Sequence, residues 1–77
     1  MNNQQTVPAT TTTLLDVIVP TQMWIKAISN SIYVGYNSDV DNTDGYLLLA
    51  DTDYVFTAKT PLYIYAASET VVHYITI

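Results

Sequence analysis

Short apolar segments, each ended by turn-forming residues, are the feature that most restricts the fold of this chain. They begin at Leu14 and are separated by clusters of Asn, Asp, Ser and Pro. No segment longer than about ten residues has the i, i+3, i+4, i+7 apolar spacing of an amphipathic helix. We therefore expect about seven short strands at spacings near ten residues. The expected strands are residues 14–20, 21–28, 32–36, 46–50, 54–59, 62–67 and 70–77.

The later strands alternate between two faces, and both faces are apolar or aromatic. Leu62 and Ile64, for example, share one face of their segment, while Tyr63 and Tyr65 share the other. Strands of this kind are typical of a sandwich or barrel whose outer face meets another surface. The sequence predicts an all-β fold, a small antiparallel sandwich or jelly-roll-like barrel, with an extended N-terminal arm.

The arm is predicted over residues 1–13, which are mostly Asn, Gln and Thr with almost nothing apolar. Such a segment is expected to be flexible, or ordered by a partner, outside the core. Residues 14–77 are expected to form a single β-domain. The first residues also lack the basic and apolar regions of a secretory signal, so we expect synthesis in the cytoplasm.

Size and charge narrow the class of protein. A core built from 77 residues leaves little net stability, and the chain has no cysteine for disulfides or thiolate metal sites. The remaining sources of added stability are a bound hard cation or partner subunits, and we expect an assembly. The net charge is -5, with Lys26 and Lys59 as the only basic residues. Nucleic acid and anionic membranes are therefore not expected as partners.

Tyrosine is abundant, with seven in a chain of which only 12% is charged. Tyrosine suits interfaces because it buries its ring while its hydroxyl keeps a hydrogen bond. We predict interface roles for Trp24, Tyr63, Tyr65 and Tyr74. For Trp24, an anchor in the core or in an interface is favoured over a surface that stacks on sugar rings.

The segment NSDVDNTDGYLLL gathers Asp39, Asp41 and Asp44 beside Gly45. An EF-hand calcium loop needs glycine at its sixth position and a bidentate glutamate at its twelfth. Counted from Asp39, those positions hold Asp44 and Ala50, so the register fails. We favour a solvated turn in which Gly45 supplies a positive φ. A looser Ca²⁺ site built from the three aspartates is the alternative, and no other cofactor is expected.

Nothing in the sequence has the pattern of a catalytic centre. His73 is the only histidine and lies in an alternating strand, and the only glutamate is Glu69 in the preceding turn. The serines lie in expected turns, without the context of a nucleophile elbow. Gly35 and Gly45 are too far apart to form a phosphate-binding loop. We therefore predict that the chain is not an enzyme.

The order of motifs from Met23 onward resembles a group of short β-rich virion proteins of tailed phages. The motifs are MWIKAISNSIYVGY, SDV, DGYLLLADTDYVF, TPLYIYAAS and the closing VVHYITI. The shared positions are Trp24, Ala27, Tyr33, Val34, Gly35, Asp39, Val40, Gly45, Tyr46, Leu48, Leu62, Tyr63 and Ala66. The chain departs from the pattern at Tyr36 and at residues 51–53, where members of the group often have glycine.

The resemblance implies a capsid decoration (cement) protein or a head-fibre module, made in the host cytoplasm and located on the capsid surface of the virion. It further implies a homo-oligomer, commonly a trimer, that binds the major capsid protein. A glycan-binding, lectin-like module of a fibre or surface protein is the alternative. A third reading is a small acidic inhibitor of a basic partner, whose binding would depend strongly on salt.

Overall fold

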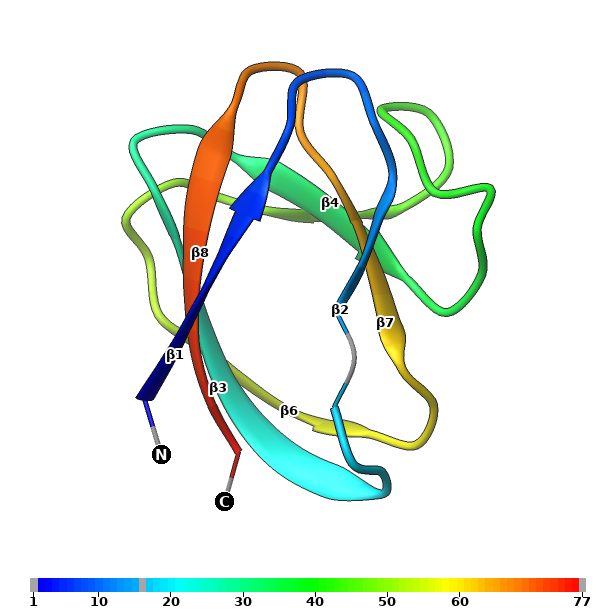
Figure 1. Ribbon diagram of the computed structural model, residues 1–77, viewed down its shortest axis with the longest axis vertical. Coiled ribbons are helices and arrows are strands. Elements are labelled where there is room, and N and C mark those ends of the chain that lie inside the picture. Colours follow the sequence, from blue (N-terminus) through cyan, green and yellow to red (C-terminus); the bar gives the residue numbers. More distant parts are fainter. Residues whose placement is uncertain (1, 16, 77) are drawn as a thin grey trace.

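The computed structural model describes residues 2–15 and 17–76, and within them the predicted all-β fold is confirmed. Eight strands form two four-stranded antiparallel sheets (Figure 1). The strands are β1 (Asn2–Val7), β2 (Thr13–Leu15), β3 (Thr21–Ile28), β4 (Ile32–Gly35), β5 (Tyr46–Leu48), β6 (Tyr54–Ala58), β7 (Leu62–Tyr65) and β8 (Thr70–Thr76). No helix that could cross a membrane is present in the described part of the chain.

The strand order shows a nested arrangement. One sheet has the order β1-β8-β3-β6, which we call sheet I, and the other has the order β2-β7-β4-β5, which we call sheet II. First and last strands pair, as do β2 with β7, β3 with β6 and β4 with β5. The chain is therefore folded like one long hairpin that is wound into two layers. This is the arrangement of a jelly-roll sandwich.

Each of the seven strands expected from the sequence is present; β3 has the expected bounds, and the other six are shorter. The largest difference is in the first expected strand, residues 14–20, of which only the start belongs to β2. Asp16 of that segment, Ile77 of the last expected strand and Met1 of the expected arm lie outside the described residues.

The predicted N-terminal arm is the part of the fold that the structure corrects. Residues 2–7 form β1, which pairs with β8 along its whole length, from Asn2 opposite Ile75 to Val7 opposite Thr70. Val7 has no exposed surface and belongs to the core. A polar edge strand needs few apolar residues because only one of its faces packs inward, so its composition resembled that of an arm. The rest of the predicted arm is also tied to the domain, since the Thr10 amide donates to the Ala66 carbonyl over 2.8 Å and Thr13 begins β2.

The core lies between the two sheets and is built from their inward-facing side chains. Met23 and Ile25 of β3 and Val72 of β8 come from sheet I, and Ile32 of β4 and Ile64 of β7 come from sheet II. All five are fully buried. They occupy alternate positions along their strands, as the period of two predicts.

Two turns at one end of the sandwich are joined by hydrogen bonds. Ser29, after β3, and Asp51, after β5, both adopt left-handed backbone conformations, with φ of 72° and 58°. The Ser29 amide donates to Asp51 Oδ1 over 3.1 Å, and the Asp51 amide donates to the Ala27 carbonyl over 2.7 Å. Aspartate tolerates this conformation better than most residues, so Asp51 can replace glycine in the turn.

Candidate interaction site

Sheet II presents an outward surface of five apolar side chains, which we call the aromatic face: Leu14, Tyr33, Leu47, Tyr63 and Tyr65. Each alternates along its strand with a buried core residue. The strand register brings them together, since Leu14 lies opposite Tyr63, and Tyr33 lies opposite both Tyr65 and Leu47. Cross-strand neighbours of this kind are within reach of each other's side chains. The five residues therefore form one continuous surface.

The aromatic face is accessible and carries no charged side chain among its members. Leu14 is 45% exposed and Leu47 is 44% exposed. The rings of Tyr33 and Tyr65 pack against each other at a tilt of 51°, with centroids 6.5 Å apart, a common geometry for aromatic pairs. An apolar surface that lacks charge and contains tyrosines has the composition of the core of a protein interface.

The four predicted interface residues do not lie together. Tyr63 and Tyr65 belong to the aromatic face, whereas Trp24 points outward from β3 on the opposite side of the sandwich. Tyr74 shares the inward side of β8 with Val72 and packs against the core. Tyr74 is half-buried on the core side of β8 and lies apart from Tyr63 and Tyr65, and its interface role stays a prediction.

The outer surface of sheet I, which we call the mixed face, combines apolar and polar rows. Trp24 lies opposite Ile75 on one side and Val55 on the other, forming an apolar row across three strands. The next row pairs Lys26 with His73. His73 therefore stands beside a cation on an open surface.

The acidic loop between β4 and β5, residues 36–45, is held down by Val40, which is 3% exposed. A Cβ built on Gly35 would collide with Val40 Cγ2, and one on Gly45 would lie 3.1 Å from Val40 Cγ1. The hydroxyl of Thr12 donates to the Val40 carbonyl over 2.7 Å, which ties the loop to the residue before β2. Neither glycine has a positive φ, so Gly45 is required for close approach and the predicted positive φ is wrong.

Val40 packs on the outer side of sheet II. Gly35 follows Tyr33 by two residues and so shares its outward direction, and Val40 is not a member of the core cluster between the sheets. The acidic loop therefore covers one end of the sheet from outside and borders the aromatic face.

The carboxylate of Asp41 organises the tip of this loop. Its Oδ1 accepts hydrogen bonds from the Thr43 amide at 2.8 Å, the Thr43 hydroxyl at 2.8 Å and the Asp44 amide at 2.9 Å. The Thr43 amide is the largest cause that lowers the pKa of Asp41 below 3.8, since it stabilises the charged form. Asp41 thus stabilises the turn at the tip of the acidic loop.

The three candidate calcium ligands are not gathered into one site. Within the residues that the structure describes, no three or more His, Cys, Asp or Glu side chains lie close enough to hold a metal ion. Asp39 donates its amide to Asn37 Oδ1 over 3.0 Å, as part of a separate local turn.

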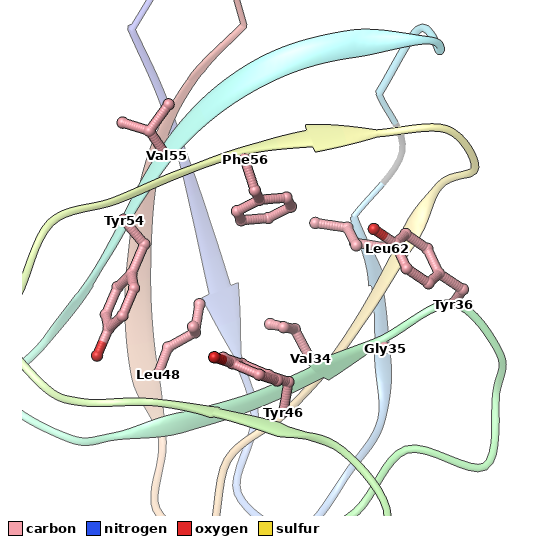
Figure 2. Close-up of a pocket in the computed structure, with 9 residues that line it drawn as sticks. All are labelled: Val34, Gly35, Tyr36, Tyr46, Leu48, Tyr54, Val55, Phe56 and Leu62. Carbon is pink, nitrogen blue, oxygen red and sulfur yellow. The ribbon is translucent and has the colours of Figure 1, made fainter.

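A pocket of about 340 Å³ lies between the sheets, beside the edge strands β5 and β6 (Figure 2). In Figure 2, Phe56 points from β6 into the pocket and faces Val34 and Leu48 of the opposite sheet. The other residues that line the pocket are Gly35, Tyr36, Tyr46, Tyr54, Val55 and Leu62. The lining offers apolar surface and tyrosine hydroxyls, which suit binding rather than acid-base chemistry.

The pocket tyrosines differ in how they are held. The Tyr54 hydroxyl accepts a hydrogen bond from the Leu49 amide at 2.9 Å, which links β6 to the end of β5. Tyr36 is 54% exposed and Tyr46 is 72% exposed, so their rings stand at the mouth.

Sequence reasoning missed Leu14, Tyr33 and Leu47 of the aromatic face and all of the pocket tyrosines. Their alternation with buried neighbours indicated an outward direction, but only the strand order shows which residues become neighbours. Comparison of the chain with protein-family models, with curated proteins and with solved structures finds no match in any of the three.

Proposed function

We propose that this chain is a non-enzymatic structural protein of a phage virion, a capsid decoration protein that self-associates and binds the shell. The aromatic face is the observation that carries the proposal. An apolar surface with three tyrosines and no charge is unfavourable in water and favourable against another protein. Such a protein needs only modest contacts, because many copies act together on a repeating surface.

The fold is compatible with this role and does not by itself select it. Jelly-roll sandwiches occur in viral capsid proteins and also in lectins. Fold-level analogy is weak support, so the choice rests on the surface. The five residues of the aromatic face favour a protein partner, since a sugar site also needs polar groups placed to bind hydroxyls.

The residues behind the resemblance to virion proteins give further support. Gly35, Val40 and Gly45 are among the shared positions, and in the fold they form one interlocked group. Three shared positions that pack against one another support the resemblance more strongly than three matches at positions without contact. The threefold association that the resemblance implies would use the aromatic face, which the acidic loop borders.

Co-sedimentation with capsid shells that lack the protein tests the proposal. Tyr65→Lys places a charge in the aromatic face and is expected to abolish attachment. Gln22→Lys is the matched control, because it adds the same charge at an exposed strand position on the mixed face. Attachment by both variants, or by neither, would count against the aromatic face as the contact surface.

The pocket favours a second candidate, a glycan-binding module. Its volume of about 340 Å³ and the rings of Tyr36 and Tyr46 at the mouth suit a sugar ring. A glycan array separates the two functions. Binding that disappears in Tyr46→Ala and persists in Tyr65→Lys would favour the module over the decoration protein.

A further inference from the structure

Strand β6 has a free edge. Its one neighbour in sheet I is β3, so the backbone amides and carbonyls on its other side have no strand partner among residues 2–15 and 17–76. Free edges attract other strands, and proteins commonly protect them with proline, charge or very short length. The segment YVFTA contains neither proline nor a charged residue. Its edge is therefore open to pairing.

Opposite charges flank this edge strand. Asp53 immediately precedes β6 and Lys59 immediately follows it. Both residues are exposed, and neither has an ion-pair partner within the described part of the chain. The protein has only two basic residues, so the position of Lys59 at the end of an open strand is a specific feature.

We propose that two copies of this chain pair through β6 in an antiparallel manner, with Phe56 on the two-fold axis. This register places Phe56 opposite Phe56 of the second copy and Tyr54 opposite Ala58. It also places Asp53 of each copy opposite Lys59 of the other. Because the contact is two-fold symmetric, each residue pair occurs twice. The Asp53–Lys59 attraction is therefore present at both ends of the paired β6 strands.

The pocket gives an independent reason for the same partner. Phe56 points from β6 into the pocket, and residues directly opposite in an antiparallel pair share a face. The second copy's Phe56 therefore comes to lie on the pocket side, at the mouth that Tyr36 and Tyr46 flank. Pairing covers an apolar opening that is otherwise in contact with water.

The other free edges fit a second copy less well. β2 and β5 have three residues each, which is short for a stable ladder. β1 has six residues, NNQQTV, with no charge to set a register. β6 alone combines length, apolar side chains and complementary ends.

The contact does not depend on the proposed function and does not use the aromatic face. It adds a two-fold link to whatever assembly that face forms, so breaking it should halve the mass of the assembly. Tyr65→Lys, by contrast, should leave the β6 contact intact. The two proposals can therefore fail separately.

Charge reversal tests the pairing, with mass measured by sedimentation across a concentration series at low ionic strength. Asp53→Lys and Lys59→Asp are each expected to raise the dimer Kd about tenfold or more, because both pairs of the dimer change from attraction to repulsion. The double variant D53K/K59D restores both pairs and should return to the wild-type Kd. An equimolar mixture of the two single variants should form a heterodimer, since each supplies the charges that the other needs.

Asp39→Lys is the matched control for Asp53→Lys, because it changes the net charge equally at a position away from β6 and should leave the mass unchanged. The double variant has the wild-type net charge and is the control for Lys59→Asp. Circular dichroism confirms that every variant is folded. Amide hydrogen exchange gives a second readout: residues 54–58 should become better protected as the wild-type concentration rises. A monomeric wild-type protein at millimolar concentration, or a double variant or mixture that stays monomeric, would overturn the pairing.

Discussion

The two sheets of this sandwich are alike on their inner sides and different on their outer sides. Inside, both present alternate, fully buried aliphatic residues, such as Ile25 in sheet I and Ile64 in sheet II. Outside, sheet I carries Lys26 and His73 among apolar neighbours, whereas the aromatic face of sheet II has no charged member. The inner sides specify the fold, and the outer sides decide which surface can meet a partner. Similar strands can therefore have different roles on their two faces.

The comparison predicts, first, that the inner sides contribute equally. Ile25→Ala and Ile64→Ala should each lower the free energy of unfolding by about 2–5 kcal/mol, the usual range for emptying a well-packed aliphatic site. Denaturant unfolding measures both variants. If alanine leaves either variant unfolded in buffer, Ile→Val at the same sites should cost about 0.5–1.5 kcal/mol. A large loss at one site and none at the other would show that one sheet dominates the core.

The second prediction concerns the place where sheet II is covered by its own chain. Gly35→Ala should destabilise the protein by about 1–3 kcal/mol, because the new methyl group needs the space that Val40 occupies. Adding Val40→Ala should recover part of that loss, since the smaller side chain removes the collision. A double-mutant cycle in denaturant measures the coupling. Strictly additive losses would mean that the two side chains do not compete for the same space.

The third prediction concerns the tip of the same loop and has a pH dependence. The folded pKa of Asp41 is lowered from 3.8, so its hydrogen bonds are fully present above that pH and are lost as the pH falls through the folded pKa. Amide resonances of Thr43 and Asp44 should shift together in that acidic range. The core amides should stay unchanged there. Asp41→Asn should remove the acid transition, and a transition that persists would point to another carboxylate.

The smallest effect on stability is expected on the aromatic face itself. Leu47→Lys should change the free energy of unfolding by less than about 1 kcal/mol, because the side chain is already 44% exposed. The same variant should weaken self-association through that face. Gln22→Lys on the mixed face should affect neither property. Sedimentation and denaturant unfolding of the two variants together separate association from folding.

Much of the fold followed from local pattern. Alternation and turn residues located seven strands and separated the two faces of β7 and β8, because both depend on neighbours within a few residues. β1 was not predicted. It is an edge strand with one inward face, and apart from Val7 it has the composition of a polar tail. Pairing partners such as Asn2 and Ile75 are set by the whole chain, so no local pattern contains them.

The candidate site was less predictable for the same reason. The period of two shows that Trp24 and Tyr63 both point away from the core, but it does not say on which sheet each lies. Only the strand order separates them onto opposite sides of the molecule. The close approach of Val40 to Gly35 and Gly45 likewise joins positions on either side of a loop, and neither glycine alone predicts it.

The nested pairing also has a consequence for biosynthesis. Among the described strands, β1 is synthesised first and its partner β8 last, and β8 also lies between β1 and β3 in sheet I. The β4–β5 hairpin is the most local pairing and can form early, whereas closing either sheet requires strands from both ends of the chain. β1 and one edge of β3 therefore stay unpaired until β8 is made, whereas the strands of sheet II can already be paired. Chaperones that shield unpaired apolar strands are expected to bind this edge of β3 until β8 is complete.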